Sequence, residues 1–374
     1  MGQTPPESMR ASPRELLLLA MLAITFRAGV FLTVITIFPL SLEQYAFKGD
    51  GESYLLYAAA LCGEEDLAEL DTYHRRVFPG YPALIALLHL GGVPLAAAGL
   101  SITWCAAGLA AALAAMVFED RRVGYATALL VPHYAINSSL VMSESVLLAF
   151  TLAGLALALR ARGRAALAAA GVVFGCAGLV RPMACFAVLG AMAVLSVQAE
   201  GRRRWVGPLL VGATALGTVM AGYALLHAWS GDATEGARIY REHPGAYGGR
   251  MWALPFEALI PWALESEFGW GRRAYIWLHV AVVLAGCAIV LARLCAADRD
   301  SRDVAAGPWL VGNTIFVILI APPWGFAHFP RFTIPAGPAL FWTLRRWLPE
   351  RRRWWLLIAG ALFVFAVAGV RDSP

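Results

Sequence analysis

Acidic side chains that could accept a proton from a substrate hydroxyl stand beside long apolar runs of the sequence. Asp50 lies between two glycines in Gly49-Asp50-Gly51-Glu52-Ser53-Tyr54, where the backbone can bend and expose a carboxylate. Such a carboxylate can act as a general base, and Glu52 is a second polar group available to a substrate. The same residues suit a helix N-cap, which is the structural alternative.

A second acidic position, Glu144, opens an apolar run within Ser143-Glu144-Ser145. Ionisable residues at membrane depth are costly, so Glu144 is a candidate for a catalytic role. The alternative is an acid favoured by the helix dipole at a helix start. His133, shortly before it in Val131-Pro132-His133-Tyr134, is a candidate substrate contact.

Arginines that could bind a phosphate group occur near these acids in the expected topology. Arg75 and Arg76 precede Phe78-Pro79-Gly80-Tyr81-Pro82, an aromatic and proline-rich entry to the next apolar run. A guanidinium group can bind phosphate through two parallel hydrogen bonds, and Tyr81 is a further substrate-binding candidate. Ordinary contacts with lipid headgroups are the alternative for the arginine pair.

Two more arginines stand at the edges of apolar runs. Arg181, followed by Pro182, separates two such runs, and Arg331 opens a late one within His328-Phe329-Pro330-Arg331-Phe332. An arginine in this setting needs a partner, either a substrate phosphate or a carboxylate such as Glu144. A purely structural ion pair for Arg181 and interfacial anchoring for Arg331 are the alternatives.

The chain that carries these residues is too apolar for a soluble domain. Of its 374 residues 59% are hydrophobic and 15% charged, and the mean hydropathy is +0.64. We therefore expect an all-α polytopic membrane protein, one domain over residues 1–374, with about 11 transmembrane helices. The expected helices are 16–42, 96–118, 123–137, 141–160, 165–180, 183–199, 205–228, 273–297, 307–321, 331–346 and 353–371.

The positive charges indicate orientation rather than a nucleic-acid partner. Lys48 is the only lysine, and the arginines behind the net charge of +5 gather in short loops, as the positive-inside rule expects of cytoplasmic loops. This orientation leaves a first outer loop, 43–78, with short interfacial helices and the catalytic acid, and a second outer loop, 229–272. Residues 79–92 are read as interfacial or re-entrant, because a full crossing would turn the arginine loops outward. A bacterial inner membrane with an active site on its outer side is expected.

Several short motifs resemble those of the membrane-embedded glycosyltransferases of the GT-C superfamily, with the pattern closest to the PIG-V-like mannosyltransferases. The matching features are Asp50, the run Phe78 to Leu84, Ser143 to Ser145, Leu179 to Pro182 and Pro330 to Phe332. The pattern usually has an aromatic residue before the first-loop aspartate, whereas Gly49 stands here. This departure bears on the donor sugar.

The resemblance implies transfer of a hexose, mannose-like, from a polyprenyl-phosphate sugar to an acceptor hydroxyl with inversion. Asp50 would be the base, Glu144 would orient a partner, and the arginines would stabilise the departing phosphate. The acceptor would be a glycan, a glycolipid or a protein. No cofactor is indicated, and a divalent metal stays an open alternative. A flippase or transporter of lipid-linked substrates, or a polysaccharide ligase or polymerase, is the competing interpretation.

Overall fold

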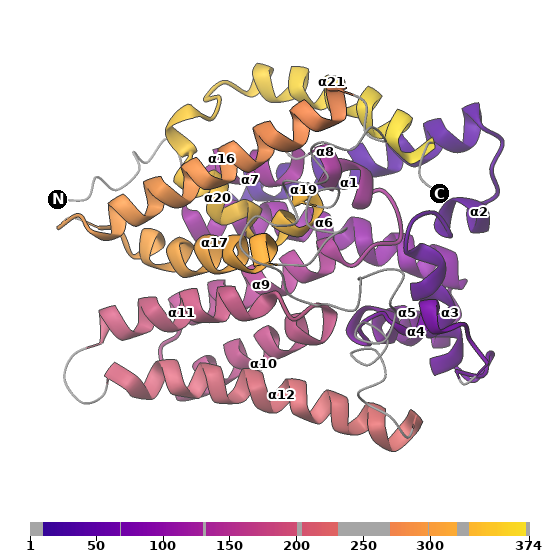
Figure 1. Cartoon of the computed structure of the whole chain (residues 1–374), viewed down its shortest axis with the longest axis horizontal. Helices are drawn as coiled ribbons and strands as arrows, with labels where there is room; N and C mark the ends of the chain where they lie inside the picture. The colour runs from indigo at the N-terminus through magenta and orange to yellow at the C-terminus, as the bar shows by residue number, and fades with distance from the viewer. Residues whose placement is uncertain are drawn as a thin grey trace.

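The protein is all-helical throughout the residues that its structure, a computed structural model, describes: 10–67, 69–129, 132–199, 204–230, 270–297, 299–319 and 329–371 (Figure 1). Within these residues five helices are long and apolar enough to cross a bilayer. They are α1 (Pro13–Ile37), α6 (Leu95–Phe118), α12 (Val206–Ser230), α16 (Trp270–Leu294) and α21 (Arg352–Arg371). The expected class, an all-α membrane protein, is confirmed; about 11 crossings stays a prediction. The second outer loop, 229–272, lies outside the described residues except at its ends.

Shorter apolar helices pack beside the long ones. They are α9 (Glu144–Arg160), α10 (Arg164–Val180), α11 (Ala184–Gln198) and α17 (Ser301–Leu319), and α10 packs closely against both α9 and α12. Glycines permit this approach: a Cβ on Gly171 or Gly175 would meet Thr214 or Thr218 of α12 at less than 3 Å. Small residues bring membrane helices together because lipid offers no hydrophobic drive for their association.

The helix expected over 123–137 is not continuous. The structure has α7 (Arg121–Leu129) and α8 (Pro132–Asn137), since a proline nitrogen cannot donate a helical hydrogen bond. Arg27 of α1, fully buried, donates to the carbonyl oxygen of Ala128 in the last turn of α7 (3.0 Å) and to the hydroxyl of Ser138 after α8 (2.9 Å). Its guanidinium group thus bonds a backbone acceptor and a side-chain acceptor beside the break.

The helix expected over 331–346 is likewise interrupted. It divides into α19 (Phe329–Thr333), the 3₁₀ turn η3 (Ile334–Ala336), α20 (Gly337–Thr343) and the 3₁₀ turn η4 (Arg345–Trp347). Pro335 and Pro338 account for the change, because each removes a backbone donor. The consequence is that Arg331 sits on a separate short segment rather than on a spanning helix.

The short helices of the predicted first outer loop, residues 43–78, gather at one end of the bundle, which we call the Asp50 end (Figure 1). They are α2 (Leu42–Ala46), α3 (Gly51–Leu61), α4 (Thr72–Arg75) and, directly after the loop, α5 (Gly80–Leu90). At 11 residues, α5 is about 16 Å long, too short for a hydrocarbon core of about 30 Å. Gly80 lies against the backbone of Leu179, and His89 contacts Glu64 at 2.8 Å. Both ends of α5 therefore lie at the Asp50 end, in agreement with the interfacial or re-entrant reading.

Arginine loops far apart in sequence meet at the opposite end of α1 and α6, which we call the arginine end. Glu119 pairs with Arg10 at 3.1 Å and with Arg302 at 2.7 Å, and Arg122 lies 3.8 Å from Glu350. The clustering expected from the positive-inside pattern is present, since these loops share one face of the bundle.

Close glycine contact between α10 and α12 predicts that Gly175→Ala will lower the thermal unfolding temperature of the detergent-purified protein. The added methyl group would lie 2.4 Å from the Cβ of Thr218, and overpacking of this kind costs about 1–3 kcal/mol. Gly217→Ala on α12 is the matched control, because nothing lies within 4 Å of its Cβ position. Equal unfolding temperatures for the two variants would contradict the tight α10–α12 interface.

Candidate active site at the Asp50 end

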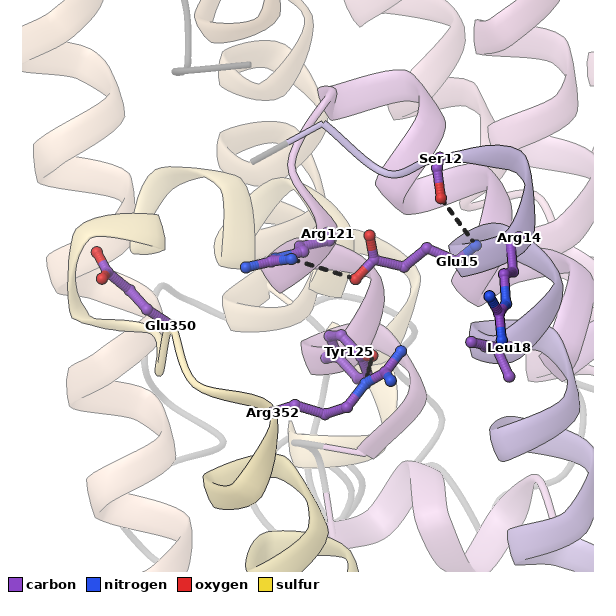
Figure 2. A pocket seen from close by; sticks show the side chains of 8 residues that line it. All are labelled: Ser12, Arg14, Glu15, Leu18, Arg121, Tyr125, Glu350 and Arg352. Atoms are coloured by element: carbon purple, nitrogen blue, oxygen red, sulfur yellow. Dashed lines mark hydrogen bonds and ion pairs between the residues drawn. The ribbon is translucent and has the colours of Figure 1, made fainter. Parts of the chain in front are cut away.

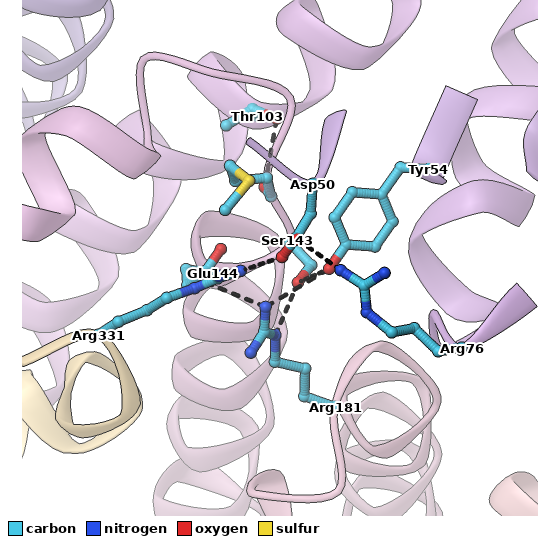
Figure 3. A network of polar contacts seen from close by, with 9 residues as sticks. Asp50, Tyr54, Arg76, Thr103, Ser143, Glu144, Arg181 and Arg331 are labelled. Atoms are coloured by element: carbon cyan, nitrogen blue, oxygen red, sulfur yellow. Dashed lines mark hydrogen bonds and ion pairs between the residues drawn. The ribbon is translucent and has the colours of Figure 1, made fainter. Parts of the chain in front are cut away.

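Five residues singled out in the sequence form one network of ion pairs, the charge cluster: Asp50, Arg76, Glu144, Arg181 and Arg331 (Figure 3). Arg331 stands at its centre. Its Nη2 lies 2.5 Å from Asp50 Oδ2, and its Nε lies 2.7 Å from Glu144 Oε1. Arg76 Nη2 donates to Asp50 Oδ1 at 2.9 Å, and Arg181 Nη2 donates to Glu144 Oε1 at 3.0 Å. The cluster is thus a continuous chain of alternating charge.

The residues of the charge cluster come from five separate parts of the fold. Asp50 precedes α3, Arg76 follows α4, Glu144 begins α9, Arg181 follows α10 and Arg331 lies in α19. The Arg331 side chain joins groups 187 and 281 positions earlier in the chain. Only the folded bundle can bring these charges together.

The backbone around Asp50 depends on its two glycine neighbours. Gly49 adopts a φ of 66°, which favours glycine, and a Cβ on Gly51 would lie 1.9 Å from the carbonyl oxygen of Ala46. Asp50 occupies the N-cap position of α3, yet its side chain makes no capping hydrogen bond. Its carboxylate is directed to the arginines instead, so the cap reading does not describe what this side chain does.

Glu144 is the most deeply buried member of the charge cluster, with 1% of its side chain exposed. Oxygen Oε1 accepts from both Arg181 and Arg331, whereas Oε2 is buried without a hydrogen-bond partner among the described residues. Ser143, just before it, accepts a hydrogen bond from Arg181 Nε at 2.7 Å. Glu144 therefore fixes two guanidinium groups at once and keeps one oxygen for a further donor.

A layer of hydroxyl groups backs the charge cluster. The hydroxyl of Tyr54 lies 2.8 Å from that of Ser143 and accepts a long hydrogen bond from Arg181 at 3.4 Å. Tyr81 packs edge-on against Tyr54 with ring centres 5.0 Å apart, and its own hydroxyl bonds Thr103 at 2.6 Å. Tyr81, expected to bind substrate, thus packs against Tyr54, which in turn contacts Arg181 of the charge cluster. Sequence reasoning missed the Tyr54 and Ser143 hydroxyls, although Tyr54 stands one helical turn after Asp50.

Three predicted residues take no place in the cluster contacts described above. Glu52 is exposed on α3. His133 stacks on Tyr275 of α16, with ring centres 5.4 Å apart and its Nδ1 3.2 Å from the tyrosine hydroxyl. Arg75 is half-buried at the end of α4, and Arg76 rather than Arg75 makes the ion pair to Asp50 described here.

The charge cluster is not electrically balanced. It holds three guanidinium groups and two carboxylates, so one positive charge is in excess. Burial by itself would raise the pKa of the Asp50 carboxyl, but the guanidinium groups of Arg331 and Arg76 outweigh burial and hold that pKa well below its usual range. Asp50 is therefore ionised at neutral pH. In the part of the chain that the structure describes, no three His, Cys, Asp or Glu side chains gather as metal ligands.

Comparison with known proteins gives a match in structure alone. No family model matches the chain, and no curated protein matches it. The fold is similar to the crystal structure of ArnT from Cupriavidus metallidurans bound to undecaprenyl phosphate, with a TM-score of 0.55 and 13% sequence identity. The match covers 89% of this chain and 62% of the ArnT chain, so this chain spans less than two thirds of ArnT's length. The match shows that the fold is similar to that of ArnT; membership of the GT-C superfamily and of the PIG-V-like subgroup stays a prediction.

The ion pairs of Asp50 predict a pH-dependent difference between the wild type and Asp50→Asn. Breaking a largely buried pair costs about 3 kcal/mol, so Asp50→Asn should unfold at a lower temperature at neutral pH. A lowered pKa stabilises the fold above the carboxyl's unfolded value of about 3.9 and loses that effect as the pH falls. The gap between the two proteins should therefore narrow from about pH 5 downward.

Thermal unfolding in detergent across this pH range measures the gap. Glu52→Gln serves as the control, because that exposed side chain should leave the curve unchanged. A gap that stays constant with pH would show that Asp50 is not held ionised by its arginine partners.

Proposed function

We propose that the protein transfers a sugar from a polyprenyl-phosphate donor to an acceptor hydroxyl, with the charge cluster as its active site. The observation that carries this proposal is Arg331, whose guanidinium group contacts both candidate carboxylates in a cluster with surplus positive charge. The cluster lies at one end of a bundle of membrane helices, where a substrate that is half lipid and half anion would place its phosphate. The fold resemblance to ArnT, which was crystallised with undecaprenyl phosphate, supports the same ligand class.

In this proposal the donor phosphate binds to the guanidinium groups of Arg181, Arg331 and Arg76. Its arrival supplies the negative charge that the cluster lacks. The bond between the anomeric carbon and the phosphate oxygen breaks, and polyprenyl phosphate leaves with the bonding electron pair. A phosphate is already a stable anion, so its departure requires positive charge rather than a general acid.

Asp50 is the proposed general base. As the acceptor oxygen bonds the anomeric carbon from the face opposite the phosphate, its proton passes to the Asp50 carboxylate, and the sugar is inverted. Paired with Arg76 and Arg331, this carboxylate is a weak base. Donor phosphate would share these guanidinium groups and so raise the basicity of Asp50. The base would thus become active when the donor is in place.

Glu144 is proposed as a positioning residue. Its Oε1 holds Arg181 and Arg331 in fixed orientations, and its Oε2 is buried and open to a donor from substrate. A hydroxyl of the bound sugar or acceptor is a group of the right chemistry to bond that oxygen. This arrangement would aim both guanidinium groups at one phosphate.

The remaining specificity is proposed from the motif pattern. The donor sugar is a hexose, mannose-like, and the acceptor is a glycan, glycolipid or protein at the outer face of a bacterial inner membrane. Gly49 is the departure from the PIG-V-like pattern, and its position next to Asp50 is where a different donor sugar would be selected.

The transferase proposal predicts that Asp50→Asn will strongly slow the release of polyprenyl phosphate. Wild type and variant are incubated with a panel of labelled polyprenyl-phosphate sugars and mixed membrane lipids as acceptors. Loss of the base should slow transfer by about 10²–10⁴-fold, because that is the usual contribution of a positioned base. Glu52→Gln, two positions away but exposed, should keep wild-type rates.

The competing functions give different outcomes in the same assay. A flippase would release nothing, and Asp50→Asn would still move lipid across vesicle membranes. A ligase or polymerase would consume a lipid-diphosphate donor instead. Either result, obtained with folded protein, would overturn the proposed donor class.

Phosphate recognition predicts that Arg181→Gln will weaken binding of undecaprenyl phosphate by about ten- to a hundredfold, since charged hydrogen bonds contribute about 1.5–3 kcal/mol. Arg181→Lys should be intermediate, because it keeps the charge but loses the fork of donors. Arg160→Gln at the arginine end is the control, since that side chain bonds only the carbonyl of Met116 in the described structure. Lipid binding measured by native mass spectrometry tests the series, and unchanged affinity in Arg181→Gln would remove this residue from the donor site.

A further inference from the structure

The arginine end holds a pocket of about 500 Å³, well away from the charge cluster (Figure 2). It opens where the first turns of α1, α7 and α21 converge, and these three helices pack against one another. Its polar lining consists of Arg14, Glu15, Arg121, Tyr125, Glu350 and Arg352, with Ser12 at the cap of α1. The site proposed for sugar transfer uses none of these residues.

The lining of this pocket carries surplus positive charge. Three arginines face two glutamates, and the only ion pair between lining residues in the described structure is long, 3.5 Å from Arg121 to Glu15. Glu350 is 67% exposed, and its ion-pair partner in the described structure is Arg122, which lies outside the lining at 3.8 Å. Three helix N-termini add their positive dipole ends at the same place. An anion entering the pocket would therefore meet guanidinium groups that are not engaged by strong internal pairs.

Tyr125 and Arg352 are held in place in the pocket lining by their mutual hydrogen bond and by packing. Tyr125 is 5% exposed and stacks on Trp355, with ring centres 5.6 Å apart. Its hydroxyl accepts a hydrogen bond from Arg352 Nε at 3.0 Å. This bond uses one nitrogen of Arg352, while the two terminal nitrogens of its guanidinium group stay available for an anion.

Exposed leucines follow the pocket residues Arg14 and Arg352 by about one helical turn on α1 and α21. Leu18 lines the pocket and is 42% exposed, and its neighbour Leu17 is 63% exposed. On α21, Leu356 and Leu357 are 57% and 64% exposed. In a bilayer, such residues contact acyl chains. A ligand with an anionic headgroup and an apolar tail matches this combination of a basic pocket and exposed apolar helix surfaces.

We propose that this pocket binds the phosphate headgroup of an anionic phospholipid, with its acyl chains along α1 and α21. The lipid belongs to the leaflet at the arginine end, and the phosphate takes the place between Arg121, Arg352 and Arg14. A basic pocket between helices at a membrane interface is the chemistry that retains such headgroups. The proposal does not rest on sugar transfer, since it concerns the other end of α1 and α6.

Native mass spectrometry of the full-length protein in detergent tests the pocket with phosphatidylglycerol as the probe and phosphatidylcholine as the neutral comparison. The wild type should prefer phosphatidylglycerol. Arg121→Gln with Arg352→Gln should lower that affinity by about fivefold for each arginine removed. Arg162→Gln with Arg164→Gln is the matched control, because both arginines are exposed outside the pocket lining, Arg162 between α9 and α10 and Arg164 at the start of α10. The control should retain the wild-type preference.

Each other outcome counts against the lipid site. Equal losses in both double variants would mean that the preference belongs to the whole basic face, and no loss in either would mean that the pocket is not involved. Displacement of the lipid by millimolar inorganic phosphate would assign the pocket to a soluble anion. Should the pocket double variant fail to fold, Arg14→Gln replaces it: Arg14 is exposed at the pocket rim, and its loss should still lower phosphatidylglycerol affinity by about fivefold.

Discussion

The arrangement of the Asp50 end depends on one constraint: a largely buried guanidinium group needs acceptors for its hydrogen bonds, and here two carboxylates supply them. Arg331 satisfies it with two carboxylates at once, and those carboxylates in turn hold Arg76 and Arg181. Removing one partner would leave an uncompensated charge in a medium of low dielectric constant. The same set of ion pairs therefore ties together the segment from Asp50 to Arg76, the start of α9, the α10–α11 turn and the short helix α19.

Interrupted helices make this arrangement compatible with a membrane. Arg331 and Arg181 stand where helices break or end, so their guanidinium groups can reach inward without distorting a spanning helix. The break between α7 and α8 is supported differently, by hydrogen bonds from the buried Arg27 to the Ala128 carbonyl and the Ser138 hydroxyl. Irregular backbone at membrane depth persists only where its polar groups find such partners.

Much of this fold could be predicted from the sequence, and the features that could not be predicted have physical causes. Hydropathy gave the class and most helix positions, and apolar context with turn chemistry singled out Asp50, Glu144 and Arg181. The sequence could not show that Arg331 joins Glu144 and Asp50, which lie 187 and 281 positions earlier. Contacts between residues so far apart leave no local pattern in the sequence. Averaged hydropathy also joined segments that Pro132 and Pro335 divide. His133 and Glu52 have polar character, but their packing directions are set by α16 and by the surface of α3.

Coupling between Asp50 and its arginines has a consequence for the proposed chemistry. A free carboxylate at the mouth of a lipid-substrate site could activate water as readily as an acceptor hydroxyl. Here two guanidinium groups pair with that carboxylate, so its basicity is low until another anion shares them. The donor phosphate is the anion that the proposed reaction supplies. The network that satisfies buried charge in the resting protein would therefore also delay base catalysis until the donor has bound.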